Sequence, residues 1–145
     1  MSDATGKRHP GLVSFSREHH HGLVQARRLL AAAGGEPPER RAALRSFRDA
    51  WEDTIASHFA DEEALLLPLV ESEELRKRLQ TDHEALRKMA AACAASSDSS
   101  DPDGDLLASL GEALRSHIQW EERVLFSAIE KTAGEAVLAS LAGRR

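Results

Sequence analysis

SHFADEEALLLP, residues 57–68, and SHIQWEERVLFS, residues 116–127, are the two stretches that decide the fold of this chain. In each of them a histidine is followed four residues later by a glutamate, which gives the pairs His58 with Glu62 and His117 with Glu121. Residues spaced by four lie one turn apart on the same face of an α-helix. Both stretches are therefore predicted to be helices on which an imidazole and a carboxylate share the core-facing side with apolar residues.

Glycine and proline divide the rest of the chain into segments of helical length. Breakers fall at 34–38, at Pro68 and in the serine- and aspartate-rich tract 96–104. The segments between them are rich in Ala, Leu, Glu and Arg and poor in β-branched residues, which favours helices over strands. Apolar residues recur at helical spacing over 13–33, 39–67, 72–95 and 103–130, and a shorter helix is expected at 133–141. This pattern predicts an all-α fold, an antiparallel up-down four-helix bundle with a short C-terminal capping helix.

Length and composition limit the classes of function. The chain has 145 residues, 41% of them hydrophobic and 30% charged, as is typical of one globular domain. We expect a flexible N-terminus over residues 1–11, in which His9 is exposed to solvent, and a single domain over residues 12–145. The net charge of −5 gives no case for nucleic-acid binding, and no apolar run is long enough to span a membrane.

Residue usage also indicates the compartment and the type of chemistry. The chain has one cysteine and no hydrophobic signal core near its start, so we expect a cytoplasmic protein. We expect either a monomer or a homodimer. Cys93 falls on an apolar stripe and is predicted to be a small buried hydrophobic residue. Trp51 and Trp120 are predicted to pack in the core, and the absence of tyrosine excludes a tyrosyl radical.

Each of the four long helices carries a histidine on the stripe that should face the core. The third helix contributes His83, and the first contributes one of three consecutive histidines. His19 shares its stripe with Phe15, whereas His20 and His21 lie on stripes that carry arginines. His19 is therefore the preferred candidate in the first helix, with His20 and His21 as the alternatives.

Four histidines and two glutamates in one small core point to a cation. A buried carboxylate without a partner is costly, and a buried polar network without a metal would be less stable than apolar packing. One shared metal centre satisfies all six groups at once. Imidazole and carboxylate ligands suit Fe or Mn, and Zn is a further possibility.

The order His, then His-x-x-x-Glu, then His, then His-x-x-x-Glu resembles the hemerythrin-like, or HHE cation-binding, family. EHHHGL at residues 18–23 resembles the first helix of that family, and HFADEEALLLP and HIQWEERVLF resemble its second and fourth helices. The resemblance covers about residues 12–130. It implies a four-helix bundle with a non-haem centre of two Fe ions joined by an oxo or hydroxo bridge. The ligands that it implies, with both glutamates bridging, are one histidine of the run 19–21, for which the helical stripe prefers His19, together with His58, Glu62, His83, His117 and Glu121.

Two positions differ from the oxygen-carrying hemerythrins. Those proteins have a second histidine on the third helix, where this chain has Arg87, and an aspartate five residues after the fourth-helix histidine, where this chain has Glu122. The four-histidine, two-glutamate arrangement instead resembles the subset that includes bacterial iron-centre repair proteins. One ligand fewer leaves one more open coordination position. This implies a small diatomic or peroxide ligand, and reaction with O2, peroxide or nitric oxide rather than reversible carriage alone.

Three classes of function stay open on the sequence alone. The first is a di-iron protein that reduces peroxide or O2, and the second is an oxygen or iron sensor, or an iron store, without turnover. The third, less favoured, is a structural bundle without metal.

Charged residues beside the candidate ligands have two readings. They either orient the imidazoles or belong to solvated helix faces that pair with Arg76, Arg78 or Arg123. The solvated reading is preferred, because charged residues on helices are mostly exposed. The residues concerned are Asp61, Glu63, Asp82 and Glu122.

Overall fold

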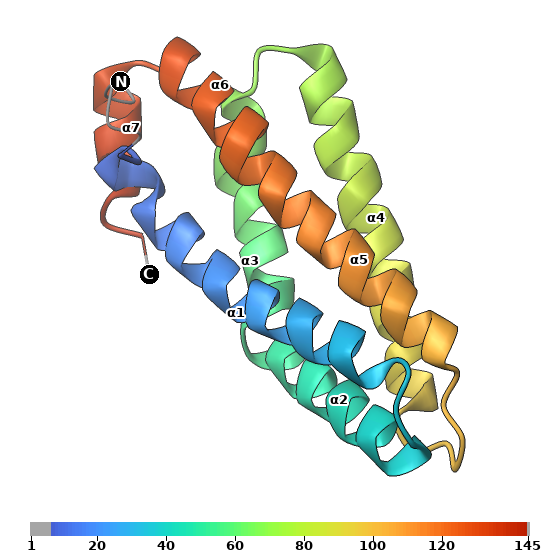
Figure 1. Cartoon of the computed structure of the whole chain (residues 1–145). Helices are drawn as coiled ribbons and strands as arrows, with labels where there is room; N and C mark the ends of the chain where they lie inside the picture. The colour runs from blue at the N-terminus through green and yellow to red at the C-terminus, as the bar shows by residue number, and fades with distance from the viewer. Residues whose placement is uncertain (1–6, 145) are drawn as a thin grey trace.

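The computed structural model describes residues 7–144, which form helices and connections with no strand (Figure 1). Two of the four long helices are continuous α-helices, and the other two are composite, running from α2 to η3 and from α5 to α6. The elements are α1 (Pro10–Ala32), α2 (Pro37–Ala50), the π-helical turn η1 (Trp51–Ile55), α3 (Ala56–Asp61), the π-helical turn η2 (Glu62–Leu66), the 3₁₀ turn η3 (Leu67–Leu69), α4 (Glu73–Ser96), α5 (Gly104–Trp120), the π-helical turn η4 (Glu121–Leu125), α6 (Phe126–Thr132) and α7 (Glu135–Leu141). The predicted all-α class is confirmed.

Consecutive long helices run in opposite directions (Figure 1). The short α7 follows the fourth long helix and lies beside the start of α1 (Figure 1). The predicted four-helix bundle with a short C-terminal helix is therefore confirmed. Within the described residues, no helix is both long and apolar enough to cross a membrane.

Prolines and polar caps set the ends of the helices. The pair Pro37 and Pro38 occupies the first turn of α2, where a missing N–H costs nothing. The side chain of Ser72 accepts a hydrogen bond from the Leu75 amide at the start of α4. Pro68 lies within the 3₁₀ turn η3, after which the backbone becomes extended, so it ends the second long helix as predicted.

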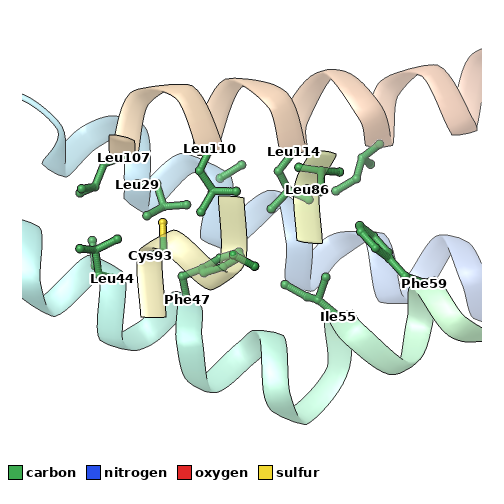
Figure 2. Packing of buried hydrophobic residues seen from close by; sticks show 14 residues of the cluster. Leu29, Leu44, Phe47, Ile55, Phe59, Leu86, Cys93, Leu107, Leu110 and Leu114 are labelled. Carbon is green, nitrogen blue, oxygen red and sulfur yellow. The ribbon is translucent and has the colours of Figure 1, made fainter. Parts of the chain in front are cut away.

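The core has two apolar clusters at different heights along the bundle. One lies toward the α1–α2 connection, where the sulfur of Cys93 packs among Leu29, Leu44 and Phe47 (Figure 2). The other includes Phe15 and the residues of α7 that face the bundle. On all four long helices the histidines and glutamates singled out above fall between residues of the two clusters. The bundle thus has a polar layer between two apolar ones.

The N-terminal segment differs from the expectation at His9. This residue is 7% exposed, its Nδ1 accepts a hydrogen bond from the Gly11 amide, and its Nε2 pairs with Glu135 of α7. The prediction that His9 is solvent-exposed is therefore wrong, because the ring caps α1 and is covered by α7. The rest of the segment expected to be flexible includes residues 1–6, which lie outside the described residues.

Candidate metal centre

The polar layer brings together the six residues that the sequence singled out. All of them are buried, and each of the four long helices supplies at least one: His19, His58, Glu62, His83, His117 and Glu121. Of the three consecutive histidines of α1, the structure places His19 in this layer and leaves His20 and His21 exposed.

The six side chains form two overlapping groups. His19 and His58 lie with Glu62 and Glu121 in one group, and His83 with His117 and the same two glutamates in the other. In each group every residue offers a ligand atom within 4.8 Å of the others. Two cation-sized sites that share two carboxylates are the arrangement of a dinuclear centre.

The oxygens of each glutamate are divided between the two groups. Oε2 of Glu62 lies 2.9 Å from Nε2 of His58, while its Oε1 lies 3.0 Å from Nε2 of His83. Oε1 of Glu121 lies 2.7 Å from Nε2 of His19, while its Oε2 lies 3.0 Å from Nε2 of His117. Each carboxylate therefore spans the two groups, as a bridging ligand does.

The donor atoms at the middle of the layer meet one another without good hydrogen-bond geometry. His58 Nε2 lies 2.9 Å from Glu62 Oε2, and His117 Nε2 lies 3.0 Å from Glu121 Oε2, as ion pairs that form no hydrogen bond. A cation bound between imidazole nitrogen and carboxylate oxygen would satisfy these lone pairs, so the residues present fit a pair of metal ions.

Every one of the four imidazoles points its other nitrogen outward to a carboxylate. The Nδ1–H of each ring donates at 2.5–3.0 Å, which fixes the ring orientation and leaves Nε2 facing the layer. The pairs are His19 with Glu122, His58 with Glu18, His83 with Glu63 and His117 with Asp82.

These pairs correct part of the preference for solvated faces. Glu63, Asp82 and Glu122 bond to imidazoles, although Asp82 also pairs with Arg78 as that reading expected. Asp61 pairs with Arg144 rather than with any of the arginines expected. The sequence reasoning missed Glu18, whose only sequence signal is its place beside His19 at the edge of the core stripe. Its partner is on another helix, and spacing along one chain does not show this.

Charges in and around the layer are strongly coupled. Burial alone would lower the pKa of His83 and His117, but the surrounding carboxylates raise both to about 9. Burial would raise the pKa of Glu121, but the imidazoles of His117 and His19 hold it well below its ordinary value. These shifts favour protonated imidazoles and ionised carboxylates in the metal-free layer, so a cation bound at Nε2 would have to displace a proton there.

Both shared glutamates begin a π-helical turn. Glu62 opens η2 and Glu121 opens η4, and the carbonyl of each accepts from the amide five residues later, of Leu67 and Phe126. A π-turn widens the helix by one residue and is frequent at functional sites. The residues after each glutamate are therefore rotated about the helix axis relative to their positions in a regular α-helix.

A small cavity lies against one half of the layer. It has room for about one water-sized molecule and is lined by both histidines of the first group, His19 and His58. The remaining wall is mostly apolar and includes Gly22, Ile55 and Ile118. In the other half, the position one helical turn after His83 is occupied by Arg87, which binds Glu63. Because Arg87 is not a metal-ligating residue, His83 is the one histidine that α4 supplies to the layer.

Comparison with known proteins agrees with this geometry. The profile of the hemerythrin HHE cation-binding domain matches residues 12–129, a range that contains all six residues of the polar layer. No curated protein and no solved structure gives a significant match. By the extent of this match, the chain belongs to the hemerythrin HHE cation-binding domain family.

Proposed function

We propose that this protein binds two iron ions in the polar layer and reacts there with O2, peroxide or nitric oxide. The observation that supports the proposal is the pair of overlapping ligand groups that share Glu62 and Glu121. In this proposal His19 and His58 hold one ion and His83 and His117 hold the other. A bound iron pair supplies two electrons for the reduction of a small oxidant.

The cavity beside His19 and His58 supports entry of a small ligand on that side. With room for about one water-sized molecule, it favours the smallest ligands over larger substrates. Its apolar wall, to which Ile55 and Ile118 contribute, disfavours filling by several waters. Gly22 keeps the space open, because a β-carbon there would lie 2.7 Å from Cδ1 of Ile118.

The chain's own groups hold protons at defined atoms around the site. The Nδ1–H of each imidazole donates a hydrogen bond to a carboxylate. Burial would raise the pKa of Glu18, but His58 and Arg144 lower it to about 2, so this carboxylate stays ionised. The chain contains no tyrosine, so oxidising equivalents have no phenol to reach.

A metal-free structural bundle is disfavoured by the composition of the layer. Four imidazoles and two carboxylates buried together form a polar network that apolar packing of the same volume would outperform in a purely structural protein. A sensor or an iron store would use the same ligands without turnover. The amount of peroxide consumed per iron pair separates these two from an enzyme.

Metal analysis and optical spectroscopy test the proposal. Protein purified without an affinity tag is loaded anaerobically with Fe²⁺, desalted and assayed for iron, then exposed to O2, peroxide or nitric oxide. We expect two irons per chain and a change in the ultraviolet–visible spectrum, and many peroxide molecules consumed per iron pair if the protein is an enzyme. A chain that retains no more iron than the Glu62→Gln/Glu121→Gln double variant, or whose iron gives no optical change, would overturn the proposal.

A further inference from the structure

An arginine and an aromatic ring accompany each of the four imidazoles. In every case the arginine pairs with the carboxylate that binds Nδ1 and also lies over an aromatic ring that contacts the imidazole. The four units are His19 with Glu122, Arg8 and Phe126; His58 with Glu18, Arg144 and Phe15; His83 with Glu63, Arg87 and Phe59; and His117 with Asp82, Arg78 and Trp120. We call each one a histidine support unit.

The support unit of His58 is built around a buried arginine, Arg144. Oε1 of Glu18 accepts from Nδ1 of His58 and from Nη2 of Arg144, both at 2.7 Å. The guanidinium carbon of Arg144 lies 3.8 Å from the ring centroid of Phe15, and that ring meets His58 edge-on with centroids 5.9 Å apart. Arg144 thus holds both neighbours of the imidazole, and its own side chain is only 6% exposed.

The support unit of His83 repeats this arrangement in the other half. Arg87 donates to both oxygens of Glu63, at 2.8 and 3.0 Å, and Glu63 accepts from Nδ1 of His83. Arg87 also lies over Phe59, which stacks flat on the imidazole. Its side chain is 41% exposed.

The arginines of the two halves come from different parts of the fold. Arg87 and Arg78, which serve His83 and His117, are both on α4 and are part of the bundle. Arg8 precedes α1 and Arg144 follows α7, so the half that contains His19 and His58 is held from outside the long helices. The segment carrying Arg144 is held close, since the carbonyl of Leu138 lies where a β-carbon on Gly11 would be.

We infer that the arginines of the support units are positioning residues for the metal ligands, and that Arg144 determines how long the His19/His58 half retains its ion. The inference rests on the proposed metal centre. A carboxylate that accepts a hydrogen bond from a ligand histidine fixes the orientation of the ring only if another group fixes the position of the carboxylate. The planar guanidinium does this by bonding to the carboxylate and stacking on the ring at once, which a lysine ammonium cannot reproduce.

The test measures metal release, using Co²⁺ as the probe. The protein is loaded with two equivalents of Co²⁺, a chelator is added in excess, and the loss of the cobalt absorption bands is followed in time. The variants are Arg144→Ala, Arg87→Ala, Arg144→Lys and Glu18→Gln. Arg45→Gln is the control, because Arg45 is exposed and its ion pair within residues 7–144 is with the exposed Asp98.

We expect Arg144→Ala and Glu18→Gln to speed the release of one of the two ions about tenfold, the lower end of the effect of removing a group that orients a ligand. Arg87→Ala should speed the release of the other ion, Arg144→Lys should fall between Arg144→Ala and the unchanged chain, and Arg45→Gln should match the unchanged chain. Glu18→Gln keeps the shape of the side chain and so replaces Arg144→Ala should that variant not fold.

Three results would overturn the inference. They are unchanged release from Arg144→Ala and Glu18→Gln, equal acceleration of both ions by Arg144→Ala and by Arg87→Ala, and full recovery in Arg144→Lys. The first would show that the support is not needed, the second would show general loosening of the fold, and the third would show that charge alone suffices. Failure of the unchanged chain to bind Co²⁺ or Fe²⁺ would instead contradict the proposed function.

Discussion

The ring of Phe59 lies flat on the imidazole of His83, with centroids 4.0 Å apart and planes 4° from parallel. Phe59 follows the candidate ligand His58 directly in the chain, but the residue that it supports is on a different helix. One turn of α3 therefore contributes to both halves of the candidate centre: His58 belongs to the first group, and the ring of Phe59 packs on His83 of the second.

Replacing Phe59 should affect stability and metal retention together. In Phe59→Leu the flat contact with His83 is lost and part of the buried ring volume becomes empty. We expect a loss of about 1–2 kcal/mol in the free energy of unfolding, measured by urea denaturation, and faster metal release. Phe47→Leu is the matched control, because Phe47 lies in the same apolar cluster and its aromatic ring contact within the described residues is with Trp51 rather than with an imidazole. It should lose stability without a change in release rate.

The consecutive histidines of α1 should differ sharply in their effect on metal content. His19→Ala removes a group from the polar layer, whereas His20→Ala alters an exposed side chain. We expect His19→Ala to bind one ion fewer per chain and His20→Ala to bind as many as the unchanged protein, measured by metal analysis after desalting. Equal metal content in the two variants would contradict the assignment of His19.

Gly22 should control access to the cavity. In Gly22→Val the branched side chain would fill the space near Ile118 that the glycine leaves open. We expect at least a tenfold slower reaction with nitric oxide, followed by stopped-flow absorption, with unchanged iron content. Gly34→Ala is the control, because a β-carbon at Gly34 meets nothing within 4 Å. An unaltered rate in Gly22→Val would show that ligands enter by another route.

The metal-free protein should lose stability as the pH rises above neutrality. Histidine in the unfolded chain has its ordinary pKa of 6.5, while the pKa values of His83 and His117 in the folded metal-free chain are about 9. The folded state therefore binds more protons in this interval, and the stabilisation is complete below 6.5 and is lost as the pH rises through 9.

Thermal unfolding measures this dependence. The midpoint of the chelator-treated protein should fall over that interval, whereas the metal-loaded protein, whose Nε2 atoms carry no protons, should change much less and unfold at a higher temperature throughout. A metal-free protein with a constant midpoint would contradict the protonation of the imidazoles.

Cys93 should be inert in the folded protein. Its sulfur is fully buried in the apolar cluster, and burial raises the pKa of the thiol from 9.0 to about 11. An aromatic disulfide reagent at about pH 8 should therefore label the thiol only after unfolding. The release of the coloured thiolate with and without guanidinium chloride measures this, and rapid labelling of the folded chain would contradict the packing.

Much of the fold and of the polar layer follows from periodicity. The spacing of four between His58 and Glu62 places both on the core side whatever the rest of the chain does, because it depends only on the geometry of one helix. The same reasoning chose His19 over its two neighbours and placed Cys93 in the core. It failed at His9, since the burial of that ring is due to α7, more than a hundred residues away.

The sequence by itself determined which side chains face inward and that they are imidazoles and carboxylates, because helical periodicity and residue chemistry are local properties. The tertiary structure alone decided that Glu18 binds His58, that Phe59 stacks on His83 and that Arg144 binds Glu18. These contacts join different helices or a helix and a terminal segment, and they depend on how the helices are rotated and offset against one another. No spacing within one helix encodes that rotation or offset, so these contacts follow only from the folded chain.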